Sequence, residues 1–482
     1  MADEIRKYQG AVDIIKTAIL LSQARAAKAV NQEQLALYPA KSSVATDKIT
    51  NNMNRTIVFF ILALISLFLK AETIEVGGVY YKVSDKRCVE VVSSSHKYMG
   101  DITIPETIRH NGITYKVVGI GEDAFYECYD LKSISLPNSI TYVSKEAFRL
   151  CTGLSSISLP DNITVIDERA FLDCDSICFL KLPNKLKIIR NEAFGGCKKV
   201  ESITLPESLF EIHRGAFYDC EKVKSLFIPK NVQHIGYRAF RGCCGLQKIF
   251  VDSLNTRYDS RNDCNAIIES NTNILVTGCM NTIIPTDIVS IGESAFDGCS
   301  GLSSIDIPES VKFIDKGAFT WSGLKSIEIP NGVEEIGKFA FQSCNSITSV
   351  IIPESVIKID EVAFSGCDSL TAVTILGNGT YIDDEAFASC PQLVDVYLHS
   401  AFMQSVGEDV FEYCSQQAVL HVQPSVLDYY KKNNKWKYAF DKIVAIGSEK
   451  GGISTIFILS LLVLLLLMLF LIIAKKNSNR KK

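Results

Sequence analysis

The chain has no excess of charge of either sign, and this absence excludes one broad class of protein. Its 50 lysine and arginine residues nearly balance 54 aspartate and glutamate residues, so the net charge is −4. Nucleic-acid-binding domains need a clustered basic surface to neutralise phosphates. Since the body of this chain has no basic surplus, we expect no nucleic-acid partner.

The sequence also lacks the common signatures of catalysis and of metal binding. It has no H-E-x-x-H, G-x-S-x-G or G-x-x-x-x-G-K-[ST] motif, which would indicate a zinc protease, a serine hydrolase or a phosphate-binding loop. It has no C-x-x-C pair, and no histidine is spaced with carboxylates to form a metal-binding face. The six histidines are scattered: His96, His110, His213, His234, His399 and His421. We expect no enzyme activity, cofactor, metal or small-molecule substrate.

Long apolar runs are few, and the first of them covers only residues 57–69. As a helix it would be about 20 Å long, which is short for a bilayer core of about 30 Å. The segment 53–56 (MNRT) before it is typical of the start of a signal peptide, with Ala71 as the last residue before cleavage. Residues 53–71 are therefore predicted to be a signal peptide or, alternatively, an uncleaved signal anchor with residues 1–52 in the cytoplasm.

The second apolar run covers residues 453–474 and contains no charged residue. As a helix it would be about 33 Å long, enough to span a bilayer. Basic residues follow it at once, which marks the cytoplasmic side of a membrane helix: Lys475, Lys476, Arg480, Lys481 and Lys482. The sequence predicts a single-pass membrane protein with residues 72–450 outside the cell and residues 475–482 as a short cytoplasmic tail.

The strongest feature of the sequence is an internal repeat marked by a phenylalanine that usually follows an alanine. Six of these phenylalanines are spaced 23 residues apart, and six more follow an interruption: Phe125, Phe148, Phe171, Phe194, Phe217, Phe240, Phe296, Phe319, Phe341, Phe364, Phe387 and Phe411. A cysteine stands three residues after the phenylalanine in eleven of the twelve copies, and Ser322 replaces it in the copy of Phe319. A period of this length is the signature of a solenoid.

Each repeat combines a strand pattern with a turn pattern. In residues 133–136 (SISL), polar and apolar residues alternate as in a strand, and Pro137 ends the strand because it cannot donate a ladder hydrogen bond. An acidic pair such as Glu122-Asp123 precedes the Ala-Phe pair, where it is predicted to cap a short helical segment. One repeat holds too few apolar residues for a core, so successive repeats must stack on one another.

This pattern resembles the BspA-like leucine-rich-repeat family, with the consensus I-x-x-x-A-F-x-x-C-x-x-L-x-x-I-x-L-P over residues 102–446. The segment 76–81 (VGGVYY) resembles the N-terminal hairpin of the family, and residues 429–446 resemble its closing cap. The resemblance implies an α/β solenoid, a right-handed coil of short parallel strands with short helical or turn segments. It also implies adhesion at a cell surface.

These signals divide the chain into segments. In order they are a helical extension (1–52), the signal segment (53–71), an N-terminal cap (72–118), repeats (119–249), an irregular hairpin island (250–285), repeats (286–418), a C-terminal cap with a juxtamembrane stretch (419–450), the membrane helix (453–474) and the tail (475–482). Residues 14–38 resemble the helical domain of a PD-(D/E)XK-type nuclease family, without any nuclease core after it. The extension is interpreted either as foreign to the natural protein or as a cytoplasmic helix.

The cysteines allow two interpretations. Those of the repeat occupy one inward position in every copy, and their side chains would point in parallel, which disfavours disulfides. A column of small buried residues is expected. Cys264 and Cys279 flank a predicted hairpin within the island and face each other across it. We expect either a disulfide or a buried cross-strand pair between these two.

The outward strand positions carry the functional signal. Two phenylalanines, Phe227 and Phe250, are expected on adjacent strands, near Phe179 and Lys181, and either the island covers them or they bind a partner. In the second block of repeats, Glu328 and Tyr397 lie in the equivalent column. A long shallow face suits a protein or a glycan. We expect a surface binding protein, an adhesin for matrix proteins, glycans or other cells; the alternatives are a signalling receptor ectodomain and a structural surface-coat protein.

Overall fold

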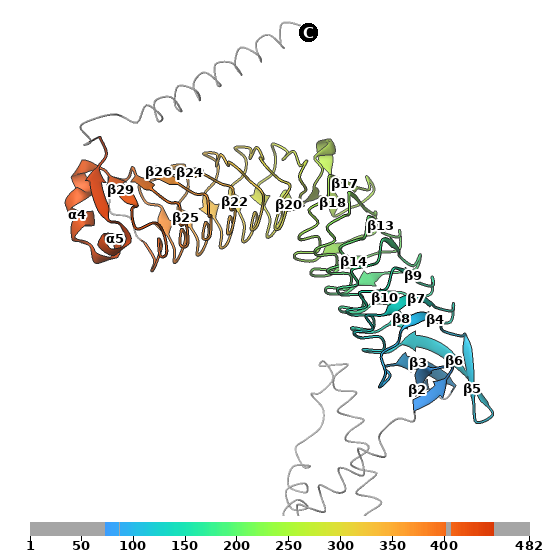
Figure 1. Cartoon of the computed structure of the whole chain (residues 1–482). Coiled ribbons are helices and arrows are strands. Elements are labelled where there is room, and N and C mark those ends of the chain that lie inside the picture. Colours follow the sequence, from blue (N-terminus) through green and yellow to red (C-terminus); the bar gives the residue numbers. More distant parts are fainter. Residues whose placement is uncertain (1–72, 86, 402–405, 448–482) are drawn as a thin grey trace, which may run out of the picture. The chain divides into compact units, whose positions relative to one another are not determined.

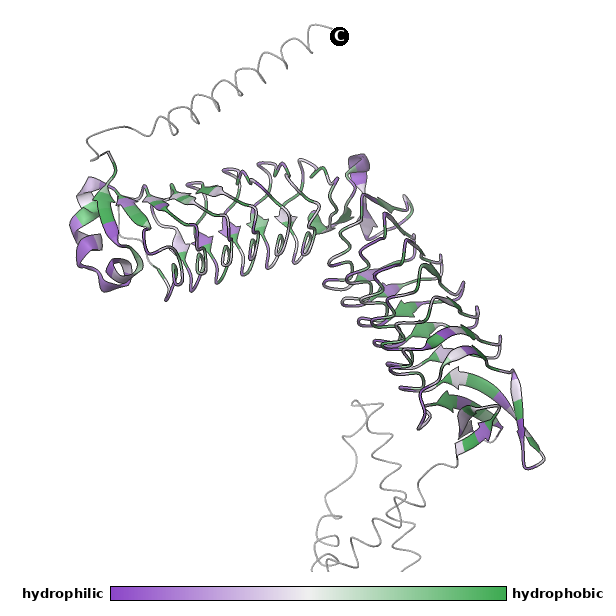
Figure 2. Ribbon diagram, in the orientation of Figure 1, coloured by the Kyte–Doolittle hydropathy of each residue, from purple (hydrophilic) through white to green (hydrophobic). Residues whose placement is uncertain are grey.

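The computed structural model describes residues 73–85, 87–401 and 406–447, which form a stack of coils with parallel strands (Figure 1). Hydrophobic and hydrophilic stretches recur throughout the coils (Figure 2), and the buried apolar residues form two core clusters that follow the stack. Within the described ranges, no helix is both long enough and apolar enough to cross a membrane. The predicted signal segment, the membrane helix at 453–474 and the nuclease-like extension lie outside these ranges.

A cap of antiparallel strands begins the stack. Its hairpin turns at Gly77 and Gly78, which both have positive φ (61° and 78°), as a type I′ turn requires. Tyr81 is fully buried beneath this cap. The strands are β1 (Thr73–Val76), β2 (Val79–Asp85), β3 (Cys88–Val92), β4 (Gly100–Thr103), β5 (Thr107–His110) and β6 (Ile113–Ile120). Because β6 pairs in parallel with β8, the cap continues directly into the coils.

Each coil of the first block contributes one strand to each of two faces of the stack. One face consists of two-residue strands in a continuous parallel sheet, namely β8 (Tyr142–Val143), β10 (Val165–Ile166), β12 (Ile188–Ile189), β14 (Glu211–Ile212) and β16 (His234–Ile235). The other face, which we call the outward face, consists of β7 (Leu131–Ser135), β9 (Ser156–Ser158), β11 (Phe179–Lys181), β13 (Ser202–Thr204), β15 (Ser225–Ile228) and β17 (Lys248–Val251). The predicted solenoid of short parallel strands is confirmed.

The Ala-Phe segments are pairs of tight turns, so the prediction of short helices there was wrong. In the first coil, the amides of Ala124 and Cys128 each donate to the carbonyl three residues earlier. Asp123 and Glu127, at the third positions of these two turns, have positive φ, as in type II turns. Between them, the Phe125 amide donates to the Ala147 carbonyl of the next coil. A helix would satisfy its backbone amides internally, whereas the Phe125 amide connects its coil to the next one.

The phenylalanines of these turns form a continuous column inside the stack. From Phe125 to Phe240, neighbouring rings stack nearly parallel with centroids 4.9 to 5.7 Å apart. A second column runs from Phe296 to Phe411 with centroids 4.8 to 5.5 Å apart. Ten of the twelve rings in these columns are fully buried. This ring spacing matches the separation of adjacent strands, so each ring packs on the same ring of the next coil.

The repeat cysteines form a second column beside the rings. The Cys151 thiol donates to the carbonyl of Phe125 in the preceding coil at 3.1 Å, and Cys174 donates likewise to Phe148. All sixteen cysteines of the chain are free thiols. Cys264 and Cys279 are both buried and do not form the disulfide that was one of two expectations for them. Burial raises the pKa of the Cys197 thiol to about 12 and that of Cys264 to about 11.

The island separates the two blocks and begins the sheet of the second. Its hairpin lies where the sequence predicts it, between β19 (Ile267–Glu269) and β20 (Ile274–Thr277), preceded by β18 (Tyr258–Asp259) and the 3₁₀ helix η1 (Arg261–Asp263). The second block continues from β20 through β21 (Ser290–Ile291), β22 (Phe313–Ile314), β23 (Glu335–Ile336), β25 (Lys358–Ile359) and β27 (Tyr381–Ile382).

The outward face of the second block ends in a mixed cap. The strands of this outward face are β24 (Ser349–Ile352), β26 (Ala372–Ile375), β28 (Asp395–Leu398), β29 (Val419–Val422) and β30 (Lys442–Ala445). The cap adds the 3₁₀ helix η2 (Pro424–Val426), α4 (Leu427–Lys432) and α5 (Asn434–Ala439). Tyr430, Trp436 and Phe440 close the end of the second core. Because both ends are covered, residues 72–447 are expected to fold without the rest of the chain.

Removing one ring from the column should destabilise the folded protein. Phe194 is fully buried between Phe171 and Phe217, so Phe194→Ala in residues 72–447 should lower the free energy of unfolding by about 3–5 kcal/mol. The matched control is Phe179→Ala, because Phe179 is 69% exposed and its loss should change little. Urea unfolding followed by circular dichroism measures both. Equal effects for the two variants would show that ring stacking does not stabilise the coils.

The cysteines should be unreactive until the protein unfolds. Thiolates are the reactive form, and burial keeps the pKa of Cys264 and of Cys279 above the ordinary value. Iodoacetamide at about pH 8 should therefore leave both unmodified in the native protein and modify both in denaturant without a reductant. Mass spectrometry of tryptic peptides reads the result. Modification that appears only after reduction would show that the two thiols form a disulfide.

Candidate binding surface

Alternation along the outward strands places the predicted site residues at the surface. In β11, Leu180 points into the core, so Phe179 and Lys181 on either side of it are exposed. In β15 and β17 the same alternation exposes Phe227 and Phe250. These two are register partners on paired parallel strands, so their side chains are neighbours about one strand spacing apart.

The phenylalanines of this face are not covered by the island. Phe179 is 69% exposed, Phe227 is 45% exposed and Phe250 is 42% exposed. The side chains of aromatic residues normally bury most of their area in a folded protein. Phe227 and Phe250 are adjacent rings that are available to a partner, and Phe179 lies two coils before Phe227 in the neighbouring outward column. We call Phe179, Lys181, Phe227 and Phe250 the aromatic patch.

The outward face that bears the aromatic patch is rich in lysine. The exposed charged residues of its strands are Lys132, Lys181 and Lys248, while Glu201 and Lys224 are exposed directly before β13 and β15. This face therefore has a net charge of +3, although the whole chain is negative. The remaining outward positions are mostly serine and threonine, such as Ser202, Thr204 and Ser225. A flat surface of this kind presents apolar contact area within a basic, hydroxyl-rich rim.

The equivalent column of the second block has different chemistry. Glu328 is exposed there, and Ile351 is 54% exposed on β24. Tyr397 on β28 stacks on His421 of β29 with centroids 4.2 Å apart. The His421 ring in turn lies 2.8 Å from a carboxylate oxygen of Asp395. This end of the column is therefore held by contacts among the side chains of Tyr397, His421 and Asp395, unlike the exposed rings of the first block.

The structure brings together only part of the predicted site. Phe179, Lys181, Phe227 and Phe250 lie on three coils of the outward face, in β11, β15 and β17. Glu328 and Tyr397 lie in the second block, beyond the island, and are three coils apart from each other. The six residues therefore belong to separate surfaces. The aromatic patch is the part that combines two adjacent aromatic rings with a lysine on the same face.

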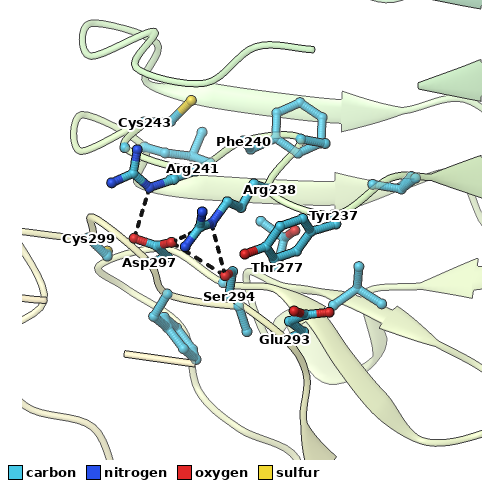
Figure 3. Close-up of a pocket in the computed structure, with 18 of the residues that line it drawn as sticks. Tyr237, Arg238, Phe240, Arg241, Cys243, Thr277, Glu293, Ser294, Asp297 and Cys299 are labelled. Carbon is cyan, nitrogen blue, oxygen red and sulfur yellow. Dashed lines mark hydrogen bonds and ion pairs between the residues drawn. The ribbon is translucent and has the colours of Figure 1, made fainter. Parts of the chain in front are cut away.

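A polar cluster at the junction of the two blocks was not foreseen from the sequence (Figure 3). The Asp297 side chain has no exposed area and lies between two arginines of the preceding coil. Its oxygens are 2.9 Å from Arg238 Nε and 3.0 Å from Arg241 Nε. Ser294 adds a hydrogen bond to Asp297 at 3.3 Å. The cavity beside them is about 60 Å³, which admits water and not an organic ligand.

The junction has a structural explanation. The stacked column of rings breaks between Phe240 and Phe296 in the part of the chain that the structure describes. The backbone of Gly278 inserts there: its amide donates to the Ala295 carbonyl, and a side chain at Gly278 would meet the Phe296 ring. Burial disfavours the Arg241 cation, but attraction to Asp297 raises its pKa overall. The ion pairs thus replace the missing ring contact as a connection between the blocks.

The sequence did contain one signal of this junction. The distance from Phe240 to Phe296 is 56 residues instead of 23, which shows that one coil contact is made by residues far apart in the chain. The repeat pattern does not reveal which residues make that contact. Arg238 and Arg241 occupy ordinary repeat positions, and only the fold places them against Asp297.

The family comparison agrees with the repeat. The sequence model of the "BspA type Leucine rich repeat region (6 copies)" matches residues 118–247 and 276–394, so it covers more than half of the chain and omits the island. No protein with a curated description matches the chain.

Several solved structures have a similar fold. A leucine-rich cell surface protein from Faecalibacterium prausnitzii is 25% identical, with 68% of this chain and 94% of that chain covered and a TM-score of 0.56. The pneumococcal vaccine antigen PcpA is 18% identical, with 79% and 99% covered and a TM-score of 0.63. A leucine-rich repeat protein from Eubacterium ventriosum is 20% identical, with 71% and 95% covered and a TM-score of 0.52.

The ion pairs at the junction should stabilise the contact between the blocks. Asp297→Asn removes the charge that two arginines share, and breaking a buried pair costs about 3 kcal/mol. The control is Asp306→Asn, because Asp306 is exposed on the outward face. Hydrogen exchange should become faster in residues 236–247 and 292–300 of the first variant only. Unchanged exchange at the junction would show that Gly278 and the backbone alone hold the blocks together.

Proposed function

The chain belongs to the BspA-type leucine-rich repeat family, and from this premise we propose that it is a cell-surface protein that binds a protein partner through the aromatic patch. Leucine-rich-repeat coils are typically binding scaffolds, because a stack of identical strands offers one long face of variable side chains. The adhesin function implied by the family resemblance is the specific form of this proposal. Matrix proteins and the surfaces of other cells are its candidate partners.

The choice of the aromatic patch as the binding surface rests on one observation. Phe227 and Phe250 are register partners on a rigid parallel sheet, and both are more than 40% exposed. Exposed aromatic side chains with few rotamers supply contact area at low entropic cost, and they dominate binding energy at interfaces. The lysines of the same face favour a partner with acidic groups near its apolar contact. A glycan remains the second candidate, since aromatic rings also stack on sugars.

The location at a cell surface rests on the sequence and on one neighbour. Residues 57–69 have the length of a signal-peptide core, and residues 453–474 have the length and flanking charge of a membrane helix. The neighbour from Faecalibacterium prausnitzii is described as a cell surface protein. We propose a single-pass anchor with the coils outside the cell.

Binding should depend on the two register-paired rings. The double variant Phe227→Ser, Phe250→Ser of residues 72–447 should lose affinity for its partner by tenfold or more, since hot-spot residues contribute on the order of 2 kcal/mol each. Immobilised matrix proteins and intact host cells serve as the probes, and surface plasmon resonance or flow cytometry measures the loss.

The matched control is Phe210→Ser. Phe210 is 48% exposed and directly precedes β14, in the other sheet of the stack. This variant should bind like the wild-type protein. Undiminished binding by the double variant would remove the aromatic patch from the proposal, and absence of binding by the wild-type protein to every probe would favour a structural surface-coat role.

A further inference from the structure

The C-terminal cap must lie close to the membrane if residues 453–474 form the anchor, as proposed above. The last described residue is Gly447, and only residues 448–452 separate it from the apolar run. A fully extended chain of that length reaches about 20 Å. Such an anchor would therefore hold the C-terminal cap near the bilayer surface.

The two helices of the cap are basic, unlike the chain as a whole. Helices α4 and α5 contain Lys431, Lys432, Lys435 and Lys437, with Asp428 as their one acidic residue. Lys442 follows at the start of β30. The two helices thus have a net charge of +3, compared with −4 for the entire chain. Basic segments next to a membrane anchor are attracted to anionic headgroups.

Most of these lysines are available for such contacts. Lys435 pairs with Glu408 of the last coil at 2.5 Å. The other four are exposed and form no ion pair with any residue that the structure describes: Lys431, Lys432, Lys437 and Lys442. An open cavity of about 1030 Å³ beside α5 is lined by lysines of the cap and by four carboxylates, those of Glu408, Asp409 and Glu412 in the last coil and that of Asp441 in the cap. The lysines come from the helices and from β30.

The helices also present an aromatic side chain and have a rigid base. Tyr438 is 85% exposed, the largest exposed fraction among the apolar and aromatic side chains of the described residues. It stands in α5 between the buried Trp436 and Phe440, whose rings pack on Phe411 of the last coil. Tyrosines with an apolar ring and a polar tip are enriched at the membrane–water interface. The packing of Trp436 and Phe440 holds α5 against the last coil and leaves Lys437 and Tyr438 of this helix exposed.

We propose that the α4–α5 cap is a lipid-contact surface that rests on the anionic headgroups of the membrane that anchors the chain. The lysines supply attraction, and Tyr438 supplies an interfacial contact. With the anchor and the cap both held, the stack has a defined base from which the aromatic patch is displayed. The inference rests on the proposed anchor for its location, and the affinity of the cap for lipid is measurable without that anchor.

The test uses residues 72–447 and two kinds of vesicle. One kind is pure phosphatidylcholine, and the other contains phosphatidylglycerol as well. Wild-type protein should co-sediment with the anionic vesicles and not with the neutral ones, and high salt should release it. The variant Lys431→Glu, Lys432→Glu, Lys437→Glu, Lys442→Glu should bind the anionic vesicles at least tenfold more weakly. Tyr438→Ser should weaken binding by a smaller factor.

A charge-matched control separates this surface from general electrostatic attraction. The variant Lys132→Glu, Lys198→Glu, Lys199→Glu, Lys222→Glu changes the net charge equally at exposed positions of the first block, and it should bind like the wild-type protein. The inference is overturned if wild-type protein does not distinguish the two kinds of vesicle, or if the two quadruple variants behave alike. Alkaline extraction of the full chain from membranes tests the anchor separately, because an anchored chain stays in the pellet whatever the cap does.

Discussion

The structure depends on the contact between one coil and the next. A single 23-residue repeat has too few apolar residues to exclude water, and its tight turns leave amides that no residue of the same coil satisfies. The next coil supplies both needs at once. Its phenylalanine ring stacks on the ring above, as Phe148 does on Phe125, and its turn carbonyl accepts the amide of Phe125. Stability therefore accumulates along the stack, and the two ends require caps.

The island shows what happens where this contact is interrupted. Between Phe240 and Phe296 the rings no longer stack, and the backbone of Gly278 occupies the gap. The lost apolar contact is replaced by a buried aspartate between two arginines. The ion pairs thus connect residues of adjoining coils where the ring column is interrupted. The island also separates the lysine-bearing outward face of the first block from that of the second, on which Asp306, Lys325 and Glu328 are exposed.

The regular core leaves the outward positions free to vary, and this freedom is the basis of function. Every second residue of an outward strand points to solvent, so its identity is not restricted by packing. Lys181, Phe227 and Phe250 occupy positions where other coils carry serine or threonine. A binding surface can thus be changed without disturbing the column of rings beneath it. The C-terminal cap is built in the same way, because Trp436 is buried in the core and Tyr438 is exposed to solvent.

The sequence by itself determined the solenoid, its period, the island and the inward cysteine column, because each follows from the spacing of apolar and turn residues along one chain. It also placed Phe227 and Phe250 on adjacent strands. It misjudged the Ala-Phe segments as helical, since the deciding hydrogen bonds go to the next coil and not to the same one. Only the tertiary structure decided that Asp297 meets Arg238 and Arg241. That outcome depends on how coils separated by the island meet, and a repeat pattern contains no information about that contact.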